Sequence, residues 1–135
     1  MSGLALLWHL SGRPAAARDL DAMLEEMAAR GPDGAARGTD GPVALGHRLL
    51  ATTPEAAVEP MPLHDPASGR WLTGEIRLDN RAELLPRFGL TQAGRIVGDG
   101  ELVLRAFDRW DEECALHLLG DFAFAIWDPG ARRVF

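Results

Sequence analysis

The sequence predicts a mixed α and β domain in which layered sheets are covered by helices, a small α/β or α+β sandwich. The first observation is a stretch over 121–127 that is apolar on both faces, so this strand must be covered on both sides. The second is the helical spacing of Leu20, Met23, Leu24 and Met27. The third is size: 135 residues, 47% hydrophobic and 25% charged, suffice for one domain with its own core.

The first half of the chain contains two clear strands. An apolar run over 3–9 predicts a buried strand that ends in a turn at 11–14, and the spacing of apolar residues predicts a helix over 15–29. Glycines and Pro32 then predict a loop from 31 to 41. A second strand is expected over 43–50.

The second half begins with a proline-rich, irregular passage from 54 to 66, with a short strand expected near 59–64. A strand follows over 71–76. Asn80, with Glu83 three residues later, resembles a capping box and predicts a helix over 81–88. Apolar spacing predicts another helix from Asp99, and a partner for strand 121–127 is expected at 133–135.

Composition excludes several classes of protein. The formal net charge of −6, without a basic stripe, argues against a nucleic-acid partner. The opening apolar run is too short for a membrane span and lacks the plan of a signal peptide. A single cysteine, Cys114, excludes an intramolecular disulfide, and we expect a cytoplasmic protein. The histidines show no metal-ligand spacing, so no metal site is expected.

Five ordered segments together resemble the class II glutamine amidotransferase domain of the asparagine synthetase family. They begin with Met1-Ser2-Gly3 and span essentially the whole chain. The others are Arg30-Gly31-Pro32-Asp33-Gly34, Leu45-Gly46-His47-Arg48-Leu49, Gly74-Glu75-Ile76 with Asn80-Arg81-Ala82-Glu83-Leu84, and Gly120-Asp121-Phe122-Ala123-Phe124-Ala125-Ile126-Trp127-Asp128.

The resemblance implies an α+β fold, the four-layer αββα sandwich of N-terminal-nucleophile (Ntn) hydrolases. Residues 1–135 would then form one amidotransferase-like domain that lacks its C-terminal strands. The family's ATP-pyrophosphatase synthetase domain is the partner that the resemblance implies, and ATP and Mg²⁺ would bind only there. We expect no cofactor in residues 1–135, and self-association through an unpaired sheet edge is expected.

In the family, a Cys follows the initiator Met, and its free α-amine serves as general base for its own thiol. An α-amine titrates near pH ~8 and can accept that proton. Ser2 stands at this position. A hydroxyl is a poorer nucleophile than a thiol, so the resemblance implies a degenerate nucleophile.

Two further family positions differ. The Arg that holds the glutamine α-carboxylate aligns with Leu49, which cannot form the bidentate pair, and Arg48 should point to the opposite face of its strand. The oxyanion-hole Asn aligns with Thr73, whose hydroxyl has a shorter reach, whereas Gly74 is kept.

Glu75 matches the family residue that helps to hold the substrate amine, and Asp99 matches the family's acidic residue at the start of the later helix. Each has a simpler interpretation: Asp99 as a helix N-cap and Glu75 as a surface carboxylate at a strand end. The relic glutamine pocket therefore comprises Arg48, Leu49, Glu75 and Asp99, with Ser2, Thr73 and Gly74 at the catalytic positions.

Three functions stay open. The first is an amidotransferase-like domain without glutaminase activity, structural in role, in an ATP-dependent C–N ligase similar to β-lactam synthetases and lasso-peptide cyclases. The second is a glutamine-hydrolysing domain that supplies ammonia for asparagine synthesis. The third is a free-standing module that binds a small amino compound through Glu75 and Asp99.

Overall fold

The computed structural model describes residues 1–135 and confirms the α+β class. Two antiparallel sheets account for all strands, with the order β1-β3-β2 in one and β4-β5-β6-β7 in the other. The strands are β1 (Gly3–Trp8), β2 (Gly34–Asp40), β3 (Val43–Leu49), β4 (Leu63–His64), β5 (Trp71–Leu78), β6 (Gly120–Asp128) and β7 (Arg133–Val134). The helices are α1 (Asp21–Glu26), α2 (Pro54–Val58), α3 (Arg81–Arg87) and α4 (Asp99–Trp110), with 3-10 turns η1 (Ala17–Leu20) and η2 (Asp111–His117).

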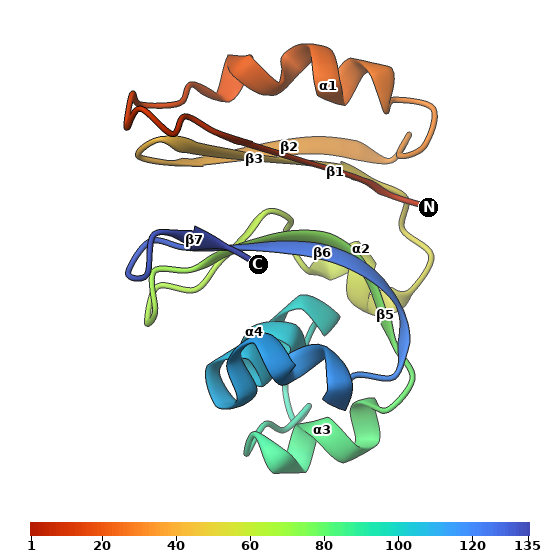
Figure 1. Ribbon diagram of the computed structural model, residues 1–135. Helices are drawn as coiled ribbons and strands as arrows, with labels where there is room; N and C mark the ends of the chain where they lie inside the picture. Colours follow the sequence, from red (N-terminus) through yellow and green to blue (C-terminus); the bar gives the residue numbers. More distant parts are fainter.

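The two sheets lie face to face, with helices on their outer sides (Figure 1). Helix α1 covers the β1-β3-β2 sheet, α4 covers the β4-β5-β6-β7 sheet, and α3 packs against α4. After β3 the chain crosses from one sheet to the other through α2, at the end of the sheets where the N-terminus lies. Assignment to the Ntn-hydrolase architecture itself stays a prediction.

The layers are joined by separate apolar clusters. Between α1 and the first sheet lie Ala5, Leu20, Leu24 and Ala44. Between the sheets lie Val43, Leu45 and Trp127. Under α4 lies the largest cluster, which includes Leu72, Leu102, Val103, Phe107 and Ile126. Strand alternation explains this division, because successive residues of β3 turn to α1 and to the second sheet in turn.

Strand β6 confirms the strand expected over 121–127. It pairs with β5 along its length, from Trp71 opposite Trp127 to Leu78 opposite Gly120. On its other edge β6 pairs with β7 at Trp127 and Asp128, and Ile126 exchanges two backbone hydrogen bonds with Phe135, at 2.8 and 3.0 Å. Because one face of β6 meets α4 and the other meets the first sheet, both faces are apolar.

The loop expected over 31–41 is wrong, because residues 34–40 form strand β2 at the edge of the first sheet. An edge strand with exposed side chains carries no apolar alternation, so its glycines read as loop signals. Gly38 has a packing reason instead, since a Cβ there would overlap the Trp71 ring.

The helix expected over 15–29 is present but shorter. Asp19 Oδ2 accepts a hydrogen bond of 3.0 Å from the Ala16 N–H, which starts the turn η1 at residue 17. Leu20 and Leu24 are fully buried and supply the face packed on the sheet. Helix α2 was not expected; Thr53 caps it by accepting from Ala56 N–H at 3.1 Å, and a proline occupies its first turn.

The capping box expected at Asn80 is wrong, although helix α3 is present. The Asn80 side chain makes no cap hydrogen bond. Its amide donates to the His117 carbonyl at 3.0 Å and accepts from the Leu119 N–H at 3.0 Å. Tertiary structure therefore uses this side chain to hold the segment that enters β6. No helix is long and apolar enough to span a bilayer.

Candidate functional site

A pocket of about 670 Å³ opens at the end of the sheets near the N-terminus. It brings together Ser2, Leu49, Gly74, Glu75 and Asp99 from the set expected to form the relic site. Thr73 and Arg48 do not line it. The remaining lining residues are Met1, His47, Leu50, Thr52, Ala56, Glu59, Met61, Ile76, Arg77, Gly120, Asp121, Phe122 and Ala123.

Ser2 directly precedes strand β1, and its hydroxyl forms two hydrogen bonds with the backbone of Leu50. The Leu50 N–H donates to Ser2 Oγ at 3.0 Å, and Oγ donates to the Leu50 carbonyl at 3.4 Å. A hydroxyl that accepts from one amide and donates to a carbonyl is poorly placed to attack a substrate. The side chain ties β1 to the end of β3.

Arg48 and Leu49 point to opposite sides of β3, as alternation predicts. Arg48 Nε donates to the Leu24 carbonyl at 2.8 Å, and its Nη2 lies 3.4 Å from Glu25 Oε2. Arg48 therefore fixes α1 and does not reach the pocket. At the position of the expected carboxylate clamp the pocket wall is the apolar side chain of Leu49.

Thr73 is fully buried, and its hydroxyl donates to the Gly46 carbonyl at 2.9 Å. This bond links the two sheets, so the hydroxyl is engaged away from the pocket. Gly74 lines the pocket and is required by packing, because a Cβ there would lie 2.6 Å from Phe124 Cβ and 2.7 Å from the Ala123 carbonyl oxygen. Both oxyanion-hole positions thus have a clear structural task.

Asp99 is only 5% exposed, and both of its oxygens are engaged. Oδ2 accepts from the Leu78 N–H at 3.1 Å, and Oδ1 pairs with the Arg81 guanidinium. Arg81 also donates to the Val97 carbonyl at 2.6 Å. Arg81 was missed as a site residue because it lies 18 positions away from Asp99 and on another helix. The N-cap interpretation of Asp99 is wrong, since Gly98 occupies that position.

Glu59 supplies the caps that the start of α4 needs. Its two carboxylate oxygens accept from Gly100 N–H and Glu101 N–H, both at 2.8 Å. Burial raises the pKa of Glu59, against the lowering effect of these two hydrogen bonds. Position 98 requires a glycine, because a Cβ there would overlap the Glu59 carboxylate. Close packing on Met61 and Glu59 likewise explains Gly100, where a Cβ would overlap Met61 Cε.

Glu75 and His47 carry the buried side-chain atoms of the pocket that have no hydrogen-bond partner. The buried Glu75 Oε2 has no hydrogen-bond partner, which contradicts its interpretation as a simple surface carboxylate. His47 is 4% exposed, and its Nδ1 also has no partner. Burial lowers the pKa of His47, so its ring is neutral near pH ~7. Sequence reasoning missed His47, although alternation along 43–49 places it on the same strand face as Leu49.

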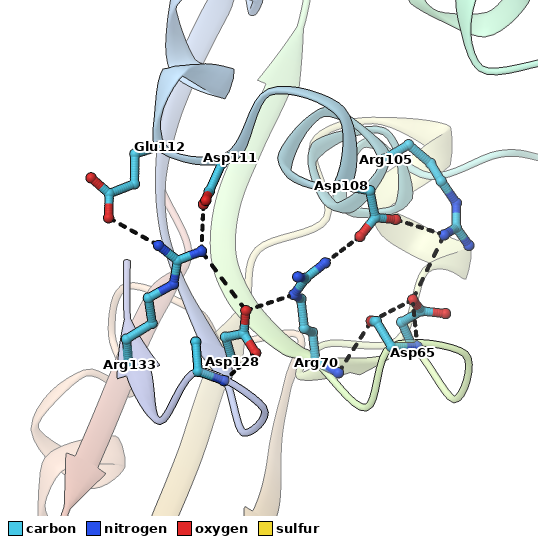
Figure 2. Close-up of polar contacts among 10 residues, drawn as sticks. Asp65, Arg70, Arg105, Asp108, Asp111, Glu112, Asp128 and Arg133 are labelled. Atoms are coloured by element: carbon cyan, nitrogen blue, oxygen red, sulfur yellow. Dashed lines mark hydrogen bonds and ion pairs between the residues drawn. The ribbon is translucent and has the colours of Figure 1, made fainter.

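A second polar cluster lies at the other end of the β4-β5-β6-β7 sheet (Figure 2). Arg70 bridges Asp128 (3.1 Å) and Asp108, and Arg133 pairs with Glu112 at 3.0 Å. Burial would raise the pKa of Asp128, but the Ala131 N–H and the neighbouring arginines lower it overall. Every charged group drawn in Figure 2 has a partner within the cluster. The cluster therefore holds the β6–β7 turn against α4 and η2.

Cys114 is fully buried, and burial raises the pKa of its thiol. Cys114 therefore packs as a small hydrophobic residue in the core under α4. No group of three or more His, Cys, Asp and Glu side chains is arranged to hold a metal ion.

Comparison with known proteins adds independent findings. A sequence model of the glutamine amidotransferase domain matches residues 1–135. Asparagine synthetase (glutamine-hydrolyzing) 3 of Bacillus subtilis strain 168 is 30% identical over 120 residues, which cover 86% of this chain and 19% of that protein.

Shorter matches reach mycobacterial proteins that are provisionally assigned as glutamine-hydrolyzing asparagine synthetases. Those of Mycobacterium bovis and Mycobacterium tuberculosis are 42% identical over 48 residues, or 33% of this chain and 7% of theirs. The chain thus spans about a fifth or less of the length of the curated relatives that it matches.

Proposed function

The chain belongs to the glutamine amidotransferase domain family and is related to asparagine synthetases, and on that premise we propose that it forms an amidotransferase-like domain without glutaminase activity. Its parent enzyme would be an ATP-dependent amide-forming ligase. The domain would pack on an ATP-pyrophosphatase synthetase domain, which alone would bind ATP and Mg²⁺. The small share of the relatives that the chain matches supports such a partner.

The observation that carries this proposal is the state of the pocket wall formed by β1 and β3. Ser2 Oγ is held by the Leu50 backbone, and the wall at position 49 is apolar. Glutamine hydrolysis needs a nucleophile and an orienting cation for the α-carboxylate. The one arginine of the pocket, Arg77, is already paired with Asp79 at 2.8 Å and Asp121 at 2.6 Å.

The alternative of an ammonia-supplying glutaminase has less support, since it requires Ser2 to leave both of its backbone partners. An amino-compound module that uses Asp99 has less support too, because Arg81 and Leu78 N–H occupy both of its oxygens. If the domain releases no ammonia, as we propose, the substrate's own amine would take the place of ammonia in the reaction of the parent enzyme. The cyclase-like proteins that the sequence resembles work in this way.

The test is release of glutamate and ammonia from glutamine by the chain, by Ser2→Cys, and by Ser2→Cys/Leu49→Arg. We expect no release above background from the unaltered chain and little from Ser2→Cys alone. The double variant should gain activity, with a lower KM than Ser2→Cys, because a guanidinium at position 49 can hold the carboxylate. Intact mass must first show that Met1 has been removed, since the free amine of residue 2 is the base.

Steady glutamate release by the unaltered chain would overturn the proposal. Equal KM values in Ser2→Cys with and without Leu49→Arg would show that position 49 is not the missing clamp.

We further propose that the chain can self-associate through the edge of β6 that faces β7, because that edge is paired only from Ile126 to Asp128. Light scattering over a tenfold concentration range, ~10 to ~100 µM, should show a rising mean mass. A constant monomer mass would refute it.

A further inference from the structure

Two arginines without a carboxylate partner lie against one tryptophan, away from the pocket. The Cζ atoms of Arg87 and Arg109 lie 5.9 Å and 5.7 Å from the centroid of the Trp110 ring. Arg87 is in the last turn of α3 and Arg109 is in the last turn of α4, so two helices contribute to this group. Both helices lie on the side of the β4-β5-β6-β7 sheet that faces away from the first sheet (Figure 1).

These two guanidinium groups lack the ion pairs that arginines form elsewhere in the chain. Arg70, Arg77 and Arg133, for example, each pair with at least two carboxylates. Arg87 and Arg109 pair with none, and Arg109 Nη1 donates instead to the Arg87 carbonyl at 3.3 Å. Because two neighbouring cations repel each other, a carboxylate that approaches both removes this repulsion and accepts charge-assisted hydrogen bonds.

The surroundings of Trp110 hold both arginine side chains in place before any partner binds. The His117 ring stacks on Trp110 with 3.9 Å between the centroids, and Phe88 packs against it edge-on at 5.6 Å. The indole in turn attracts the two guanidinium groups through cation–π contacts. Side chains that are already ordered lose less conformational entropy on binding.

Two exposed leucines extend the surface around Trp110. Leu116 is 81% exposed and Leu119 is 63% exposed, and His117 lies between them in the sequence. The Asn80 side chain fixes this segment to α3, since it accepts from the Leu119 N–H and donates to the His117 carbonyl, both at 3.0 Å. Exposed apolar side chains with a polar rim mark interaction sites, and Trp and Arg supply much of the binding energy in protein interfaces.

The carboxylates on the same elements do not neutralise the two arginines. Glu83 on α3 and Glu113 on η2 are exposed, and neither forms an ion pair. A partner must therefore approach with its carboxylates toward Arg87 and Arg109 and away from these two acids.

We propose that the surface formed by Arg87, Arg109, Trp110, Leu116 and Leu119 docks an acidic segment of a partner protein. Carboxylates of the segment would meet the two arginines, and its apolar side chains would cover the two leucines. A free phosphate would leave the leucines in water, and the net charge of −6 repels a long polyanion such as nucleic acid. This inference goes beyond the loss of glutamine hydrolysis and does not depend on it, because none of these residues lines the pocket.

The indole N–H signals of the chain report on this surface by NMR. Of the four tryptophans, Trp8, Trp71 and Trp127 belong to the cluster between the sheets, so Trp110 alone reports on the proposed surface. The probe is the blocked peptide acetyl-Leu-Glu-Glu-Leu-Glu-Glu-amide, and its control has Gln in place of every Glu. We expect the acidic peptide to shift the Trp110 signal alone and to bind at least about tenfold more tightly than the control at ~20 mM salt.

Matched variants locate the carboxylates of the peptide. Arg87→Gln/Arg109→Gln should weaken binding of the acidic peptide by about tenfold or more. Arg18→Gln/Arg132→Gln removes the same charge from two exposed arginines that contact no aromatic ring, and should change the affinity by less than about twofold. Leu116→Ser should weaken both peptides, because it removes apolar surface that they share.

Two checks keep the result independent of any loss of folding. Unchanged indole signals from the tryptophans between the sheets show that a variant is folded. In the unaltered chain, ~500 mM salt should weaken the acidic peptide and leave the control peptide unchanged, because only the first binds through charge.

Equal binding of the two peptides, or unchanged affinity in Arg87→Gln/Arg109→Gln, would overturn the inference. Tighter binding of a thymidine hexanucleotide than of the acidic peptide would overturn it too, since the arginines would then serve phosphates. A dimer that is lost in the same double variant would assign the surface to a second copy of the chain and also overturn it. None of these results bears on glutamate release, which tests the proposed function separately.

Discussion

The two walls of the pocket differ in whether their residues match the family's catalytic and substrate-binding residues. On the β1–β3 wall, Ser2 and Leu49 lack the thiol and the cation that glutamine hydrolysis would use. On the wall from β5 and α4, Gly74, Glu75 and Asp99 match the family pattern. Gly74 and Asp99 also hold the fold, through close strand packing and a buried ion pair. The comparison teaches that a matching residue can reflect a structural task, so identity alone does not show chemistry.

The largest expected effect comes from removing a carboxylate that has a protein partner, Asp99, and comparing it with removal of one that has none, Glu75. Asp99→Ala should lower the free energy of unfolding by about 3 kcal/mol, because the Leu78 N–H loses its acceptor and Arg81 loses its closest carboxylate. The mostly buried Arg81 then keeps only the Val97 carbonyl and a longer contact with Glu55, at 3.7 Å. Glu75→Ala should change it by less than about 1 kcal/mol, since no protein partner is lost. Urea unfolding followed by tryptophan fluorescence measures both.

A double variant sharpens this result. Asp99→Ala/Arg81→Ala should recover part of the stability lost in Asp99→Ala, because the mostly buried guanidinium that has lost its closest carboxylate is gone. Equal losses for Asp99→Ala and Glu75→Ala would contradict the division into structural and unsatisfied carboxylates.

A second, smaller effect concerns the start of α4. Gly98→Ala should destabilise the chain by about 2 kcal/mol, because the new Cβ forces Glu59 away from the amides that it caps. The backbone at Gly98 suits alanine (φ −75), so strain does not contribute. Urea unfolding again gives the value.

The matched control is Gly34→Ala, where the new Cβ meets only Leu49 Cβ at 4.0 Å. We expect no loss there. Glu59→Ala should cost stability too, and Gly98→Ala in that background should cost little more, because the clash partner is absent. Additive losses would show that Gly98 acts in another way.

The smallest expected effect is a pH dependence of the free energy of unfolding that comes from His47 on β3. Burial lowers the pKa of His47 in the folded chain, so the unfolded chain takes up its proton first as the pH falls. The contribution of His47 to stability is therefore complete above its unfolded pKa of ~6.5 and is lost as the pH falls from there toward its folded pKa.

Comparison with His47→Gln isolates this contribution, measured as urea midpoints between pH ~5.5 and ~7.5. The wild-type chain should lose more stability than the variant on acidification. The raised pKa of Glu59 acts with the opposite sign, since its contribution fades as the pH rises, but it is common to both proteins and cancels. Parallel pH profiles would show that His47 does not titrate as a buried imidazole.

Much of the fold was predictable because its signals are local. The strand over 121–127 is apolar on both faces, and residues 99–110 show helical spacing, so both elements are where they were expected. Edge strand β2 was mistaken for a loop, since exposed edge residues lack apolar alternation. The side chain of Asn80 was assigned to a cap that it does not form, because its real partners, His117 and Leu119, lie far along the chain.

The sequence by itself determined the family, the residue types at positions 2 and 49, and the faces of β3 to which Arg48 and Leu49 point. Residue chemistry and a period of two are local properties, so they can be read without coordinates. Tertiary structure alone decided which carboxylates are satisfied. Arg81 reaches Asp99 across 18 positions and Glu59 reaches Gly100 across 41, while nothing reaches Glu75. Such pairings depend on how distant segments pack, which no local pattern encodes.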